Sequence, residues 1–189
     1  SALLPDAPVV HLVRDPRDVA RSSVRMGWAG NVHAGLRPWL DTEAAWAAAP
    51  AALRARALHM RYEDLVAHPE AELRRLCAFL GLDYAPQMLR YDAHTSYARP
   101  DPSLAFQWRG KATRREIRLV EGRASALMEP LGYTPSGHGA HRPGRAELAW
   151  LAVQNKAANF RFGVRRYGLS RALRLRAARL FGRAGAERA

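Results

Sequence analysis

An arginine and a serine, eight residues apart, stand where a strand is expected to run into a helix. Arg14 follows the apolar run Val9–Val13, whose composition predicts a buried strand. Asp15 and Pro16 are typical of a helix N-cap and first helical position. The arginine is therefore predicted at the carboxyl end of a strand, where open α/β sheets bind anions. A guanidinium and the Ser22 hydroxyl, two helical turns further on, suit a phosphate group.

Structural roles for the same residues are the alternatives. Arg14 could pair with Asp15 or Asp18, which would leave no guanidinium for a ligand. Ser22 could bond back to its own helix backbone, as helical serines often do. Ser23 is the neighbouring candidate hydroxyl.

Two later segments have recognisable patterns. The sequence Arg-Tyr-Glu-Asp-Leu at 61–65 precedes a helix that begins at Pro69 and ends at Gly81, as expected from N-terminal proline and C-terminal glycine signals. Trp108 precedes a second helix, which is followed by Leu-Gly-Tyr at 131–133. With the segment around Arg14, these are three motifs in one order along the chain.

In these motifs the chain resembles the sulfotransferases that use 3′-phosphoadenosine 5′-phosphosulfate (PAPS). The family's 3′-phosphate motif is a strand followed by R-x-P-x-D-x-x-x-S, which residues 14–22 match. The resemblance covers about residues 1–134. It implies that Arg14 and Ser22 contact the 3′-phosphate and that Tyr62 lies near the adenine. Further candidate contacts, from the basic residues around the tryptophan motif, are Arg99, Arg109 and Lys111.

The resemblance implies an α/β fold of the P-loop NTPase-like sulfotransferase type, with a partial parallel sheet, flanking helices and a basic helical C-terminal tail. The family's phosphosulfate loop, with its lysine, and its catalytic base lie before the Arg14 motif. Only thirteen residues precede Arg14, and the lysines are Lys111 and Lys156. Residues 1–134 are therefore interpreted as the C-terminal part of a sulfotransferase domain, whose catalytic residues are expected upstream.

The implied function is transfer of a sulfuryl group from PAPS to an acceptor hydroxyl or amine, which leaves 3′-phosphoadenosine 5′-phosphate (PAP) as the product. Little activity is expected from this chain alone. The acceptor, a small molecule or a carbohydrate, cannot be chosen from the sequence. Trp28, in a glycine-flanked turn, is predicted to be the most exposed tryptophan and to lie on the acceptor side. Trp39 and Trp46 are expected to pack one helix on the core.

The net charge of +13 is concentrated in residues 137–189, which hold twelve basic and two acidic residues. The predicted division is a domain at 1–134 and a linker with an Arg-rich helical tail at 135–189. The alternative function is binding of an anionic membrane surface or nucleic acid through a basic amphipathic helix. Nucleic acid is the less expected partner, and simple packing of this helix on the domain is the favoured structural interpretation.

The remaining signals are few. Cys77 stands alone on a helix face and is expected to be buried, and the histidines show no spacing typical of a metal site. No signal peptide or membrane span is evident, so a cytoplasmic location is expected. The predicted elements are strands at 8–13 and 57–61, a loop at 27–38, and helices at 16–26, 39–49, 50–55, 69–80, 86–91, from Thr113, 144–158 and 169–181.

Overall fold

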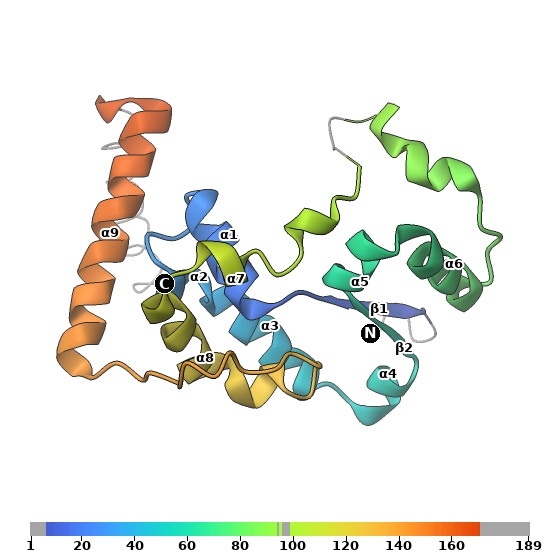
Figure 1. Ribbon diagram of the computed structural model, residues 1–189, viewed down its shortest axis with the longest axis horizontal. Helices are drawn as coiled ribbons and strands as arrows, with labels where there is room; N and C mark the ends of the chain where they lie inside the picture. Colours follow the sequence, from blue (N-terminus) through green and yellow to red (C-terminus); the bar gives the residue numbers. More distant parts are fainter. Residues whose placement is uncertain (1–6, 94, 96–98, 171–189) are drawn as a thin grey trace, which may run out of the picture.

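Two parallel strands form the centre of the molecule. In the computed structural model, which describes residues 7–93, 95 and 99–170, β1 (Val9–Val13) pairs with β2 (Ala57–Arg61) in the register Val9 to Ala57. Figure 1 shows α5 and α6 above this strand pair and α3 and α4 below it. The strand pair with helices on both sides confirms the predicted α/β class.

Local sequence signals explain most helix boundaries. Asp15 caps α1 and Gly81, with a positive φ of 68°, ends α6, because glycine adopts the left-handed conformation without strain. Thr113 and Glu116 form the expected capping box of α8. The helices in chain order are α1 (Pro16–Arg25), α2 (Val32–Gly35), α3 (Arg37–Ala47), α4 (Ala51–Ala55), α5 (Tyr62–Ala67), α6 (Pro69–Leu80), α7 (Trp108–Lys111), α8 (Arg114–Met128) and α9 (Arg145–Tyr167), with short 3₁₀ helices at Pro86–Ala93 and Pro102–Leu104.

Both predicted strands and the helices at 16–26, 50–55 and 69–80 are confirmed. The prediction that Val9–Val13 is buried is wrong in part: Val10 and Leu12 are 40% and 51% exposed on one face of the sheet, while His11 and Val13 are buried on the other. The predicted loop at 27–38 is wrong in part, because Asn31 caps α2 by accepting a hydrogen bond from the Ala34 N–H, and α3 begins at Arg37 rather than 39. Helix α5 was not expected. The helix predicted at 144–158 extends to Tyr167, and the one predicted at 169–181 lies almost entirely outside the described residues.

The hydrophobic core joins α1, α2, α3, α8 and α9. Its most buried side chains include Leu36, Met128 and Tyr133, and Trp39 lies among them. Trp46, two turns further along α3, stacks on the His11 ring with centroids 4.3 Å apart. The prediction that these two tryptophans pack α3 on the core is confirmed for Trp39, whereas Trp46 lies outside the core cluster and packs α3 on the sheet through His11. Cys77 is buried, as expected.

The linker predicted at 134–145 ends one residue earlier, because Arg145 begins α9, and the segment 134–144 lies along α8. The His141 N–H donates to the Arg118 carbonyl at 2.9 Å, and Ser136 donates to Glu121 through its N–H and its hydroxyl. Gly122 faces the His141 backbone so closely that a Cβ would collide with it. We call residues 134–144 the strap. The domain boundary at 134/135 stays a prediction.

Helix α9 packs against the turn that joins α1 to α2. The Asn155 side chain accepts a hydrogen bond from the Gly30 N–H at 2.6 Å, and Asn31 donates to the Leu151 carbonyl at 2.8 Å. Leu151 is 3% exposed. This part of the C-terminal region therefore packs on the body, whereas packing of the Arg-rich segment 161–183 stays a prediction, because most of that segment lies outside the described residues. No helix within the described ranges is long and apolar enough to cross a membrane.

A methyl group at Gly30 should loosen α9. A Cβ there would lie 2.7 Å from the Asn155 backbone, so Gly30→Ala is expected to raise amide hydrogen exchange across 145–167. The loss of stability should be about 1–3 kcal/mol, typical of overpacking. Gly144→Ala is the matched control, because a Cβ there meets nothing within 4 Å. Equal exchange in both variants would contradict this packing.

Candidate functional site

Side chains from two other helices hold the backbone in place where β1 joins α1. The Trp39 indole N–H donates to the Arg14 carbonyl at 2.9 Å, and Glu63 accepts a hydrogen bond from the Asp15 N–H at 2.9 Å. Glu63 is buried and its other oxygen accepts from the Tyr133 hydroxyl at 2.8 Å. This carboxylate therefore has a structural role.

Arg17 is the centre of a buried charge network. Its guanidinium donates to both oxygens of Asp15 and, at 2.8 Å, to Glu121 of α8. It also stacks 3.7 Å above the ring of Trp108, whose indole N–H donates to Asp15. Hydrogen bonds and charge from Asp15 and Glu121 raise the pKa of Arg17, overcoming the lowering by burial. The network therefore locks α1, α7 and α8 together.

Asp18 has a separate structural role at the start of α7. Its carboxylate accepts hydrogen bonds from the backbone N–H groups of Gln107 and Trp108, at 3.1 and 2.8 Å. It is buried, and this burial is the largest cause of its raised pKa. A side chain on the first turn of α1 therefore fixes the position of the Trp108 segment.

Arg14 is left without a carboxylate partner among the described residues. Arg17 takes Asp15 and the α7 N–H groups occupy Asp18, so the alternative of an Arg14 ion pair is not observed. One Arg14 nitrogen, Nη2, donates to the Leu104 carbonyl at 2.9 Å, and the guanidinium lies 4.2 Å over the Tyr62 ring. Its Nε is buried with no hydrogen-bond partner in the part of the chain that the structure describes.

The two candidate serines differ in the way that the motif requires. The Ser23 hydroxyl is bonded to the Val19 carbonyl at 3.0 Å and is buried against α2. The half-buried Ser22 hydroxyl makes only a 4.0 Å contact with the Met26 sulfur. Because residues four apart share a helix face, Ser22 lies on the same face of α1 as Asp18, which faces α7. Ser22 is therefore the hydroxyl available to a ligand.

The structure places the remaining candidates near the tryptophan motif. Arg109 and Lys111 are exposed on α7, which packs against α1, and the Arg109 guanidinium lies 4.6 Å over the Phe106 ring. Arg99 is exposed and lies before the 3₁₀ turn whose Leu104 carbonyl accepts from Arg14. Arg14, Tyr62 and the segment at Leu104 are thus brought together, whereas a phosphate-binding role for Arg99, Arg109 and Lys111 stays a prediction.

Sequence reasoning missed Arg17 and considered Asp18 only as a possible ion-pair partner of Arg14. The N-cap position of Asp15 gave a signal for a local bond to Arg17, but the partners Glu121 and Trp108 lie far away in the chain. Trp28 is 73% exposed, more than any other tryptophan, so that half of its prediction is confirmed. Whether it lies on the acceptor side stays a prediction.

A titratable cluster lies on the sheet face that α3 covers. His11 Nε2 lies 3.0 Å from Glu43 Oε2, and His11 Nδ1 lies 2.9 Å from His59 Nδ1. Burial raises the pKa of Glu43 to about 7 and lowers the pKa of His11. Burial, helped by the neighbouring His11, also lowers the pKa of His59. The cluster therefore favours neutral side chains.

Glu43 should make stability depend on pH. The folded state keeps the Glu43 proton up to about pH 7, whereas an ordinary glutamate loses it near 4.5. The folded state thus binds more protons in this window, and the Glu43 contribution is lost as pH rises through it. The unfolding free energy of wild type minus that of Glu43→Gln should decrease by up to about 3 kcal/mol as the pH rises from 5 to 7.5. Glu70→Gln, at an exposed ion pair, is the control; a pH-independent difference would contradict the raised pKa.

The comparisons with known proteins agree with this arrangement. A family model described as "Sulfotransferase family" matches residues 1–86. Carbohydrate sulfotransferase 6 of Homo sapiens is 30% identical over 164 residues, covering 67% of this chain and 42% of that protein. Carbohydrate sulfotransferase 7 of Mus musculus is 37% identical over 102 residues, covering 47% of this chain and 21% of that protein.

Two solved structures share the fold. The sulfotransferase domain from the curacin biosynthetic pathway has a TM-score of 0.54 at 21% identity and covers 69% of this chain and 55% of its own. The sulfotransferase domain of the Synechococcus PCC 7002 olefin synthase has a TM-score of 0.52 at 25% identity, covering 71% of this chain and 52% of its own.

The fold and the strand–arginine–helix junction thus define a sulfotransferase-type α/β protein. The chain belongs to the sulfotransferase family. It spans less than half the length of the curated relatives named above. Within the described ranges, no group of three or more His, Cys, Asp or Glu side chains could hold a metal ion.

Proposed function

We propose that this chain binds the 3′-phosphoadenosine part of PAPS, and of its product PAP, for sulfuryl transfer to an acceptor hydroxyl or amine. The observation that carries the proposal is Arg14: a guanidinium at the carboxyl end of β1, with no carboxylate partner among the described residues and a buried Nε that has no hydrogen-bond partner there. An arginine in this state gains charge-assisted hydrogen bonds when a phosphate arrives.

The other residues at the junction fit a 3′-phosphate group. The Ser22 hydroxyl can donate to a phosphate oxygen, because no strong protein partner holds it. The N-terminal end of α1 adds favourable potential for an anion. Tyr62, already beneath the Arg14 guanidinium, offers a ring face to the adenine. Arg109, Lys111 and Arg99 supply longer-range positive charge.

The bound donor would supply an activated sulfuryl group, and the residues of this chain would orient it. Arg14 and Ser22 hold one end of the nucleotide, and the buried Arg17 network keeps their supporting helices fixed, so that positioning is the main contribution of these residues. The lysine and the general base of the reaction are not assigned among the residues described here. We therefore propose that the chain alone binds PAP and has little transferase activity.

A comparison of two nucleotides tests the proposal. Calorimetric titration of the folded chain should show saturable 1:1 binding of PAP. Adenosine 5′-phosphate, which lacks the 3′-phosphate, should bind at least tenfold more weakly, because it makes no contact with Arg14 and Ser22. Equal affinity for the two nucleotides, or no PAP binding by a folded sample, would overturn the assignment.

For the acceptor we propose a carbohydrate hydroxyl, because relatives of this chain are carbohydrate sulfotransferases. The exposed Trp28 ring is suited to stack on a sugar. Trp28→Ala should leave PAP affinity unchanged and weaken binding of a carbohydrate acceptor. The alternative function, binding through the basic tail, gains no support from the comparisons.

A further inference from the structure

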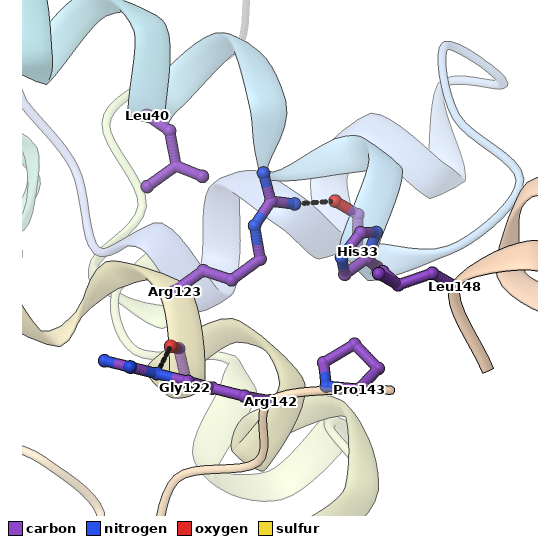
Figure 2. A pocket seen from close by; sticks show the side chains of 7 residues that line it. All are labelled: His33, Leu40, Gly122, Arg123, Arg142, Pro143 and Leu148. Carbon is purple, nitrogen blue, oxygen red and sulfur yellow. Dashed lines mark hydrogen bonds between the residues drawn. The ribbon is translucent and has the colours of Figure 1, made fainter. Parts of the chain in front are cut away.

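A pocket of about 440 Å³ lies between α2, α3, α8 and the strap, and it shares no residue with the Arg14 site. Its volume falls within the range of small-molecule sites. In Figure 2 the Leu40 and Leu148 side chains lie on either side of Arg123, and Pro143 forms part of the wall. The remaining lining residues are His33, Gly122 and Arg142. The pocket therefore combines apolar walls with cationic groups.

The two arginines that line the pocket have no carboxylate partner among the described residues. Arg123 donates to the His33 carbonyl at 2.8 Å, and Arg142 donates to the Gly122 carbonyl at 3.1 Å, as the dashed lines in Figure 2 show. Both acceptors are neutral. Arg142 is exposed to water, whereas Arg123 is half-buried beside the apolar lining, so the Arg123 guanidinium is the charge that its hydrogen bond leaves unbalanced. A positive charge lined by apolar surface and left unbalanced favours an incoming anion.

The surrounding charges leave this imbalance in place. Burial, and then the neighbouring Arg37, lower the pKa of the half-buried Arg123, while Asp41 acts in the opposite direction. Burial is the largest cause of the lowered pKa of His33. The charge of Arg123 lowers this pKa further, whereas the charge of Glu147 acts to raise it. Asp41 is paired with Arg37, and Glu147 with Arg115 and His141. His33 is thus favoured in its neutral form, able to donate or accept one hydrogen bond.

We propose that this pocket binds a small amphiphilic anion, with a carboxylate or phosphate head at Arg123 and an apolar body against Leu40, Pro143 and Leu148. The backbone is already held in place for such a ligand. Gly122 allows the strap to lie against α8, and that approach carries Arg142 and Pro143 to the pocket wall. The head-group chemistry is shared by carboxylates and phosphate monoesters, and the experiment separates them.

The test is calorimetric titration of the full chain with four probes: hexanoate, hexyl phosphate, inorganic phosphate and the neutral hexyl glucoside. We expect one-site binding of hexanoate, hexyl phosphate or both, at least tenfold tighter than inorganic phosphate and hexyl glucoside. The tighter of the two anions identifies the head group. Binding of hexyl glucoside as tight as that of the anions, or no binding of either anion, would overturn the proposal.

Variants locate the site. Arg123→Gln and Leu148→Asp should each weaken anion binding at least tenfold. Arg123→Gln removes the bond to His33 and could disturb folding. Leu148 is 41% exposed, so Leu148→Asp tests the site without that risk. Arg114→Gln, on α8 outside the pocket and exposed, should bind as wild type does. Arg14→Ala should also retain anion binding, which separates this site from the proposed PAP site. Unchanged binding in Leu148→Asp, or loss in Arg14→Ala alone, would refute the assignment.

Discussion

Replacing Arg14 with alanine is expected to weaken PAP binding by about ten- to a hundredfold. A charge-assisted hydrogen bond contributes about 1.5–3 kcal/mol, and each 1.4 kcal/mol is about a factor of ten in affinity. The substitution removes a guanidinium that has no carboxylate partner among the described residues. The substitution also removes the hydrogen bond to the Leu104 carbonyl and the stack on Tyr62, so a parallel unfolding measurement must show that the variant is folded before its affinity is compared.

Titration calorimetry of wild type and Arg14→Ala measures this effect directly. Arg25→Ala is the matched control, because Arg25 is an exposed arginine at the far end of the same helix, and it should bind PAP as wild type does. Ser22→Ala should weaken binding by about three- to tenfold, in keeping with one hydrogen bond from a neutral donor. Wild-type affinity in Arg14→Ala would remove the residue from the site.

Replacing Arg17 with methionine should have the largest effect on stability. Asp15 and Glu121 would keep their buried positions, at 0% and 3% exposure, without the guanidinium that joins them. Removing one member of a buried ion-pair network costs about 3–5 kcal/mol, a large part of a typical total of about 5–15 kcal/mol. Urea unfolding followed by circular dichroism measures the loss.

Two further variants make the result specific. Arg37→Met breaks the ion pair with Asp41, in which both side chains are more than half exposed, and should cost about 0–1 kcal/mol. Arg17→Lys keeps the charge but loses the planar fork that reaches both carboxylates, so its cost should lie between the other two. Similar losses in Arg17→Met and Arg37→Met would show that the buried network contributes little.

Local signals predicted the junction correctly. The β-branched run before Arg14, the cap at Asp15 and the proline after it are all adjacent in sequence, so strand, turn and helix could be assigned from neighbours alone. The same holds for α6, which begins at a proline and ends at Gly81. The family resemblance then gave Arg14 and Ser22 their roles, which no local pattern could supply.

Features that depend on distant contacts could not be predicted. Arg17 is an ordinary charged residue in the sequence, and its burial depends on Glu121, 104 residues away. The strap looked like a linker because its glycines and prolines form no regular element, yet it lies on α8 at Gly122. An isolated glycine inside a helical pattern often has a packing reason, so Gly122 was a sequence signal that another segment packs closely on α8. Helix α2, four residues long, is too short for a periodic pattern.

The location of the 3′-phosphate tests the central claim most directly. A crystal structure of the folded chain with PAP should show phosphate density within hydrogen-bond distance of the Arg14 guanidinium and the Ser22 hydroxyl. The Arg17 network with Asp15 and Glu121 should be unchanged from the arrangement described here. PAP bound with its 3′-phosphate away from Arg14, or bound only in the pocket at Arg123, would contradict the account.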